Sequence, residues 1–205
     1  MKSSALLLLL AGIGFVAPTH ATPVVDIAPK LATQPVAHDA EDPAIWVHPT
    51  DPAQSLVLGT NKVAAPQGAL YAFDLNGRTK QIIPGLDRPN NVDVQTGFAL
   101  GGKPVDIAVV TERNAGRLRV YSIENGRLRD LAPRGLPVFA GEIGGNAQPM
   151  GIGLYKRPRD GAVFAIVSRK EGPESGYLWQ YRLDRKSGSA GMPRPYSRSL
   201  MPSSA

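Results

Sequence analysis

Three basic residues occupy matching places in the sequence, each just past the end of a short apolar run. They are Lys62 in Thr60-Asn61-Lys62, Arg113 in Thr111-Glu112-Arg113 and Lys170 in Ser168-Arg169-Lys170. Brought to one rim, they would form a positive bowl that suits a polyanion, because a forked guanidinium beside ammonium charges commonly holds phosphate groups. A single cation of this kind is more simply a solvated loop charge. The repetition raises a phosphate site to the same standing as solvated loop charges, and both alternatives stay open at this point.

An acidic segment lies upstream of these cations. His38-Asp39-Ala40-Glu41-Asp42-Pro43-Ala44 places three carboxylates within four residues, ahead of a predicted strand Ile45-Trp46-Val47. Hard oxygen ligands packed this densely suit calcium better than zinc or copper. The three carboxylates of this segment are therefore candidate metal ligands. On an exposed loop the same residues could equally form a turn or a cap.

Other residues, and the absence of known catalytic motifs, limit the kinds of reaction that the chain could catalyse. Pro89-Asn90-Asn91-Val92-Asp93-Val94 offers amides and a carboxylate near the same rim, with Asx turns as the alternative. The lack of cysteine excludes thiol catalysis, Cys-ligated zinc and disulfides. The sequence contains no Arg-His-Gly, Gly-Lys-Ser/Thr or Gly-x-Ser-x-Gly motif. With histidine only at His20, His38 and His48, a His-rich metal site is not expected.

The elements that would position these side chains are short strands. Outside the first residues, β-branched and aromatic runs alternate with Gly, Pro, Asn and Asp turns, which indicates an all-β chain. Three segments repeat one strand order at a period of roughly 50 residues. The predicted middle strands are Ser55–Thr60, Val105–Thr111 and Ala162–Ser168, and the strands that follow them are Gly68–Leu75, Gly116–Ile123 and Gly176–Leu183.

A weaker fourth strand follows in the first two repeats, at Lys80–Pro84 and Leu128–Ala132, after turns at Asn76-Gly77-Arg78 and Asn125-Gly126-Arg127. Four-stranded antiparallel repeats of this size are typical of β-propeller blades, with a β-sandwich or an open meander as the alternative. The segment 184–205 is rich in Ser, Pro, Gly and Arg and carries no strand pattern. Since closed propellers use about four to eight blades, we expect a truncated propeller, with a tail that a shifted reading frame would explain.

The ends and the charge bear on location and partners. Lys2, the apolar run Ala5–Val16 and Thr19-His20-Ala21 predict a signal peptide over 1–21, an extension over 22–37 and a periplasmic or secreted protein with no membrane span after cleavage. The formal net charge is +6, which favours acidic partners. The sequence has no basic stripe and only 6% aromatic residues, so nucleic-acid binding is not expected.

Four motifs resemble those of the β-propeller phytases in order and spacing. They are Asp39-Ala-Glu-Asp-Pro-Ala-Ile-Trp-Val47, Leu58-Gly-Thr-Asn-Lys62, Asn90-Asn-Val-Asp-Val94 and Arg169-Lys-Glu-Gly172, and the likeness covers nearly all of 38–183. The resemblance implies a six-bladed propeller that hydrolyses phytate and related phosphomonoesters with several calcium ions and two neighbouring phosphate sites. It implies that Lys62, Arg113 and Lys170 bind substrate phosphate and that Glu41 and Asp42 contribute to the calcium cluster.

The sequence departs from this family at three points. Glu41 stands where the family usually has Asp, and Met150 stands where a Tyr often lies in the phosphate site, although Met cannot donate a hydrogen bond. Most of the family's calcium ligands lie in later blades. We therefore expect a calcium-dependent phosphomonoester hydrolase acting on phytate, here as an incomplete and inactive chain. The alternative is a propeller that binds phosphate, another polyanion or a protein without catalysis.

Overall fold

The computed structural model describes residues 27–184, and these residues form an all-β structure of twelve strands in three antiparallel sheets. The only helical turns in this range are two 3-10 turns, η1 (Pro52–Gln54) and η2 (Gly144–Ala147). The predicted signal peptide at 1–21 and the tail from 185 lie outside the described residues. Within 27–184 no helix is long and apolar enough to cross a membrane. The all-β prediction is confirmed.

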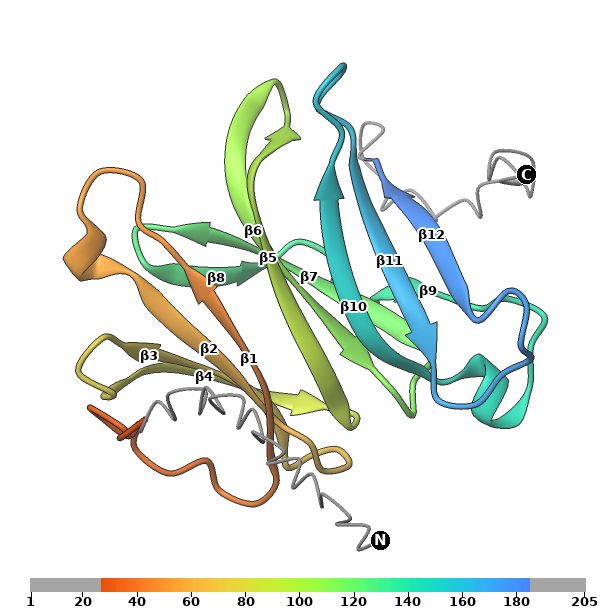
Figure 1. Ribbon diagram of the computed structural model, residues 1–205, viewed down its shortest axis with the longest axis horizontal. Coiled ribbons are helices and arrows are strands. Elements are labelled where there is room, and N and C mark those ends of the chain that lie inside the picture. The colour runs from red at the N-terminus through yellow and green to blue at the C-terminus, as the bar shows by residue number, and fades with distance from the viewer. Residues whose placement is uncertain (1–26, 185–205) are drawn as a thin grey trace, which may run out of the picture. The chain divides into compact units, whose positions relative to one another are not determined.

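Each sheet corresponds to one predicted repeat, and its strands follow one another in chain order (Figure 1). The first sheet contains β1 (Ala40–Trp46), β2 (Leu56–Asn61), β3 (Gly68–Asp74) and β4 (Thr79–Leu86). The second contains β5 (Pro89–Leu100), β6 (Lys103–Glu112), β7 (Arg117–Glu124) and β8 (Arg127–Asp130), and β9 (Leu136–Pro137) also pairs with β7. The third contains β10 (Pro149–Lys156), β11 (Val163–Arg169) and β12 (Leu178–Leu183).

Strand β6 shows how the sequence builds the core. Side chains alternate between the two faces of a strand, so Ile107 and Val109 point into the cluster shared with the third sheet. Ala108 and Val110 point the other way, into the cluster shared with the first sheet. All four are fully buried, and burial of each of the three larger side chains contributes about 1.5–3 kcal/mol. The second sheet is therefore apolar on both faces.

The segment before β1 packs on the first sheet. Val36 lies against the buried Tyr71 and Phe73. The backbone N–H of Gln34 donates to the carbonyl of Gly77 at 2.7 Å, and the Gln34 side chain accepts from the N–H of Thr79 at 2.8 Å. Part of the predicted extension 22–37 thus covers the outer face of this sheet.

Both predicted hairpin turns join antiparallel strands. Asn125 and Gly126 have φ angles of 50° and 68°, the left-handed pair that a two-residue type I′ turn requires. The other turn is longer. There the Asp74 carboxylate accepts from the N–H groups of Asn76 and Arg78, both at 2.9 Å.

A β-bulge recurs at one place in the first strand of every sheet. The register shifts between Ala40 and Pro43 in β1, between Pro89 and Val92 in β5, and between Pro149 and Ile152 in β10. Bulges are frequent next to functional sites, where they redirect side chains. The expectation that Glu41 and Asp42 lie on a loop before the first strand is wrong, because the bulge lets β1 continue pairing with β2 back to Ala40.

The first strands of the three sheets are neighbours. β5 packs against β1 on one side and β10 on the other, although no ladder joins them. Adjacent blades of a propeller meet in this way. The closed ring and its blade number remain predictions.

Candidate phosphate-binding site

Lys62, Arg113 and Lys170 hold equivalent places in the three sheets, each at or just past the end of the second strand. One backbone hydrogen bond fixes each of them. The N–H groups donate to the carbonyl of the residue at or just before the start of the first strand, with Lys62 bonded to Asp39 at 2.7 Å, Arg113 to Arg88 at 3.1 Å and Lys170 to Gln148 at 2.8 Å. The repeat inferred from the sequence therefore extends to an equivalent backbone hydrogen bond in each of the three sheets.

Buried hydroxyl groups join the same strand ends across neighbouring sheets. The Thr60 hydroxyl donates to the carbonyl of Asn90 at 2.9 Å, and the equivalent Thr111 hydroxyl donates to the carbonyl of Met150 at 2.7 Å. Within its own sheet, Thr111 also accepts from the N–H of Asn91 at 3.0 Å. The bulge of one sheet is thus fastened to the strand end of the sheet before it.

The Lys62 ammonium lies between two carboxylates of the acidic segment. It contacts Glu41 at 2.9 Å and Asp39 at 3.7 Å. Its side chain is 18% exposed and those of the carboxylates more so. Ion pairs as open as these contribute at most about 1 kcal/mol. An incoming anion could therefore exchange with the carboxylates at little cost.

Arg113 is the buried cation of the set, with 8% of its surface exposed. Its Nη2 contacts the side-chain oxygen of Asn90 and the sulfur of Met150. Burial lowers the pKa of Arg113, and the positive charge of Arg88 lowers this pKa further, while Glu41 and Asp39 raise it. Among the described residues no carboxylate forms an ion pair with Arg113. Its charge remains available to an anionic ligand.

Lys170 has a more exposed side chain, at 44%, and forms an ion pair with Glu171 at 3.2 Å. Lys62, Glu41, Asp39 and Arg113 are connected by the ion pairs of Lys62 and by the effect of the two carboxylates on the pKa of Arg113. Over residues 27–184, Lys170 is related to this group only by its backbone position, which is equivalent to those of Lys62 and Arg113.

The two candidate calcium ligands differ in their contacts. Glu41 pairs with Lys62, whereas Asp42 accepts from the N–H of Val92 in the next sheet at 3.0 Å. Within residues 27–184, no group of three or more His, Cys, Asp and Glu side chains lies close enough to hold a metal ion. These two carboxylates fit part of a calcium shell, and the described residues do not complete one.

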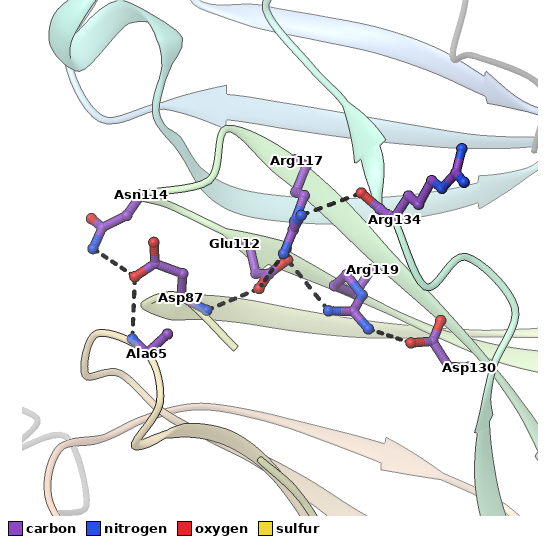
Figure 2. A network of polar contacts seen from close by, with 8 residues as sticks. All are labelled: Ala65, Asp87, Glu112, Asn114, Arg117, Arg119, Asp130 and Arg134. Atoms are coloured by element: carbon purple, nitrogen blue, oxygen red, sulfur yellow. Dashed lines mark hydrogen bonds and ion pairs between the residues drawn. The ribbon is translucent and has the colours of Figure 1, made fainter. Parts of the chain in front are cut away.

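A carboxylate that the sequence did not single out lies directly before Arg113. Glu112 is fully buried and accepts hydrogen bonds from Arg117 and from the N–H of Asp87, the latter at 2.9 Å (Figure 2). Arg119 lies 3.7 Å from the same carboxylate and also pairs with Asp130. Glu112 therefore anchors the Asp87-Arg88 turn to the end of β6. The sequence signal that could have indicated a carboxylate partner such as Glu112 was the pair of arginines, Arg117 and Arg119, on one face of β7.

A shallow hollow lies at the other end of the first two sheets. It is lined by Trp46, His48 and Asp106 among others, and the Trp46 indole N–H donates to Asp106 at 2.7 Å. Glu41 is near the start of β1 and Trp46 at its end. The cations and this hollow are therefore separate features, and the charged rim is the better candidate site.

Comparison with known proteins adds two findings. The sequence model of the phytase family matches residues 1–188. A 3-phytase of Bacillus subtilis (strain 168) is 32% identical over 152 residues, which cover 71% of this chain and 37% of that protein. The chain thus spans little more than a third of the length of this curated relative.

Proposed function

Because the chain belongs to the phytase family, we propose that it carries the phosphate-binding part of a phosphoric monoester hydrolase that releases phosphate from phytate. The observation that supports this proposal is the threefold equivalent placement of Lys62, Arg113 and Lys170 at the strand ends. The match covers 37% of the relative, so we propose phosphate binding for this chain and hydrolysis for the larger domain, with little turnover by the chain alone.

The three basic residues would bind phosphate in different ways, according to their burial and their contacts. Arg113 is buried and oriented by Asn90, so its guanidinium is a fixed donor for one phosphate group. Lys62 is held by open ion pairs and would exchange Glu41 for a phosphate oxygen. Lys170, the most exposed of the three, would reach another phosphate of the same substrate. Fixed positive charge would stabilise the charge that develops during hydrolysis.

We propose calcium as the cofactor of the complete site. Glu41 and Asp42 would supply two of its oxygen ligands, and the others would come from carboxylates outside residues 27–184. Calcium would neutralise phosphate charge and activate water for direct attack. Export through the predicted signal at 1–21 would place the protein in the periplasm or the medium, which fractionation of expressing cells would test.

Phosphate binding without hydrolysis is the second candidate. The ion pair between Lys62 and Glu41 favours this second candidate, because it gives Glu41, a candidate calcium ligand, the different role of holding the Lys62 ammonium. Calcium dependence distinguishes the two candidates.

The test measures phytate binding by calorimetry and phosphate release by colorimetry, each with calcium and with a chelator. Lys62→Gln and Arg113→Gln should weaken phytate binding about tenfold each, as expected for the loss of one charge-assisted contact. Arg127→Gln is the control, because Arg127 is exposed at the far end of the second sheet. No phytate binding by the unchanged chain at millimolar concentration would refute the phosphate site. Calcium-independent phosphate release would refute the metal-assisted reaction.

A further inference from the structure

Arg88 lies between the first two cations of the site. Its N–H donates to the carbonyl of Val63, the residue after Lys62, at 3.0 Å. Its own carbonyl accepts from the N–H of Arg113 at 3.1 Å. One residue of backbone therefore links the strand end that carries Lys62 to the one that carries Arg113.

The conformation of Arg88 is unusual and firmly held. Its φ is 58°, in the left-handed region that residues other than glycine rarely adopt. The preceding Asp87 fixes it, because the N–H of Asp87 donates to the buried Glu112 at 2.9 Å and its carboxylate accepts from Ala65 at 3.2 Å and Asn114 at 3.0 Å (Figure 2). The Asp87-Arg88 turn is thus clamped between two sheets.

The charge at this position is the opposite of that in the first sheet. Asp39 and Arg88 are equivalent, since the carbonyl of each accepts from the backbone N–H of the basic residue, Lys62 or Arg113, in its own sheet. Asp39 lies near Lys62 and offsets its charge, whereas Arg88 adds a second positive charge beside Arg113 and lowers the pKa of Arg113 in addition to the effect of burial. The second sheet therefore concentrates positive charge where the first sheet balances it.

Each guanidinium keeps a buried donor that the described residues leave without a partner. The Nε atoms of Arg88 and Arg113 are both buried without a hydrogen-bond partner among the described residues. Over the same range Arg88 forms no ion pair. Two neighbouring cations with unused donors are unfavourable alone and become favourable when an anion lies between them.

We propose that Arg88 is a further phosphate-binding residue and holds the same phosphate group as Arg113. The inference rests on the proposed phosphate site and adds a residue to it. The ligand class is a phosphorylated small molecule whose phosphate accepts from both guanidinium groups.

The test is phytate binding by calorimetry in chelator, so that the result is independent of turnover. Arg88→Asn should weaken binding about tenfold, and Arg88→Lys should restore part of it because Lys keeps the charge without the fork. Asn is chosen because it tolerates the left-handed conformation. Arg127→Asn, which removes the same charge at the far end of the sheet, should stay within about twofold.

A double-mutant cycle tests whether the phosphate is shared. If Arg88 and Arg113 hold one phosphate, the loss in Arg88→Asn/Arg113→Asn is smaller than the product of the single losses. Without anion, Arg88→Asn should also melt about 2 °C higher than the unchanged chain, because a like-charge contact is removed. This higher melting temperature verifies folding independently of binding.

The outcomes separate the two proposals. If the unchanged chain does not bind phytate, the proposed site and this inference both fail. If Arg113→Asn weakens binding and Arg88→Asn does not, only the role of Arg88 is refuted. Independent, multiplicative losses would refute the shared phosphate.

Discussion

Replacing Thr111 with valine tests how neighbouring sheets are held together at the site. Valine keeps the volume of threonine and removes its hydroxyl, which here accepts from the N–H of Asn91 at 3.0 Å and donates to the carbonyl of Met150 at 2.7 Å. Thr111 is fully buried. Each lost bond costs about 1 kcal/mol, since both backbone partners are only partly buried and water can reach them, so we expect about 2 kcal/mol in total.

Thr60→Val is the matched comparison. Thr60 is equally buried at the equivalent position, and among residues 27–184 its hydroxyl forms a single bond, to Asn90 at 2.9 Å. It should cost about 1 kcal/mol, half the loss at Thr111.

Urea unfolding measures both variants. The midpoint should fall about twice as far for Thr111→Val as for Thr60→Val, with an unchanged dependence on urea concentration because the exposed surface is the same. Equal midpoints for the two variants, or a smaller shift for Thr111→Val, would show that the second bond of the Thr111 hydroxyl, which joins β6 to Asn91 of β5 within the second sheet, adds no stability to the bond that reaches the third sheet.

Three further changes probe other contacts. Glu112→Gln should lower the free energy of unfolding by about 3 kcal/mol, measured in denaturant, because it leaves the Arg117 guanidinium without its charged partner. The pKa of the buried Tyr181 is raised to about 12, chiefly by burial, so stability should hold below pH 10 and fall as the pH rises toward 12, less steeply in Tyr181→Phe, as followed by thermal melts. Asn125→Ala should cost about 1 kcal/mol and Asn125→Gly nearly nothing, because the φ there is 50°.

Controls for these changes come from the same sheets. Glu124→Gln alters an exposed carboxylate of β7 and should leave the free energy of unfolding within about 0.5 kcal/mol. Parallel alkaline melts of the unchanged chain and of Tyr181→Phe would contradict the raised pKa. Asn76→Ala is the turn control, since Asn76 lacks a positive φ; an equal loss at both asparagines would rule out backbone conformation as the cause.

Local sequence signals predicted the strands and turns well. Alternating apolar residues located the second and third strands of each sheet within a few residues, because alternation reflects burial on one or both faces. Asn125-Gly126 predicted its turn because these residue types adopt a positive φ readily. The second repeat differed at its end. β8 stops at Asp130, whose carboxylate accepts from the N–H of Ala132, and a short β9 pairs with β7 instead.

The features that were missed depend on contacts between distant segments. The bulge that places Glu41 and Asp42 inside β1 is set by pairing with β2, and no local signal marks it. Glu112 looks like a rim charge in sequence, and its burial follows from Arg117 and the Asp87 turn. The sequence did not single out Arg88, because its equivalence to Asp39 rests on backbone hydrogen bonds between distant segments. The roles assigned to Lys62, Arg113, Lys170, Glu41 and Asp42 remain predictions.

The carboxylate links between sheets provide a measure of how often the sheets separate. Asp42 accepts from the N–H of Val92, and Asp93 accepts from the N–H of Leu154 at 2.6 Å, so each of these amides is protected by a side chain of the neighbouring sheet. An amide inside a ladder exchanges its hydrogen only when strands part. Val92 and Leu154 exchange when whole sheets move apart, so their exchange rates report a motion to which the ladder amides are insensitive.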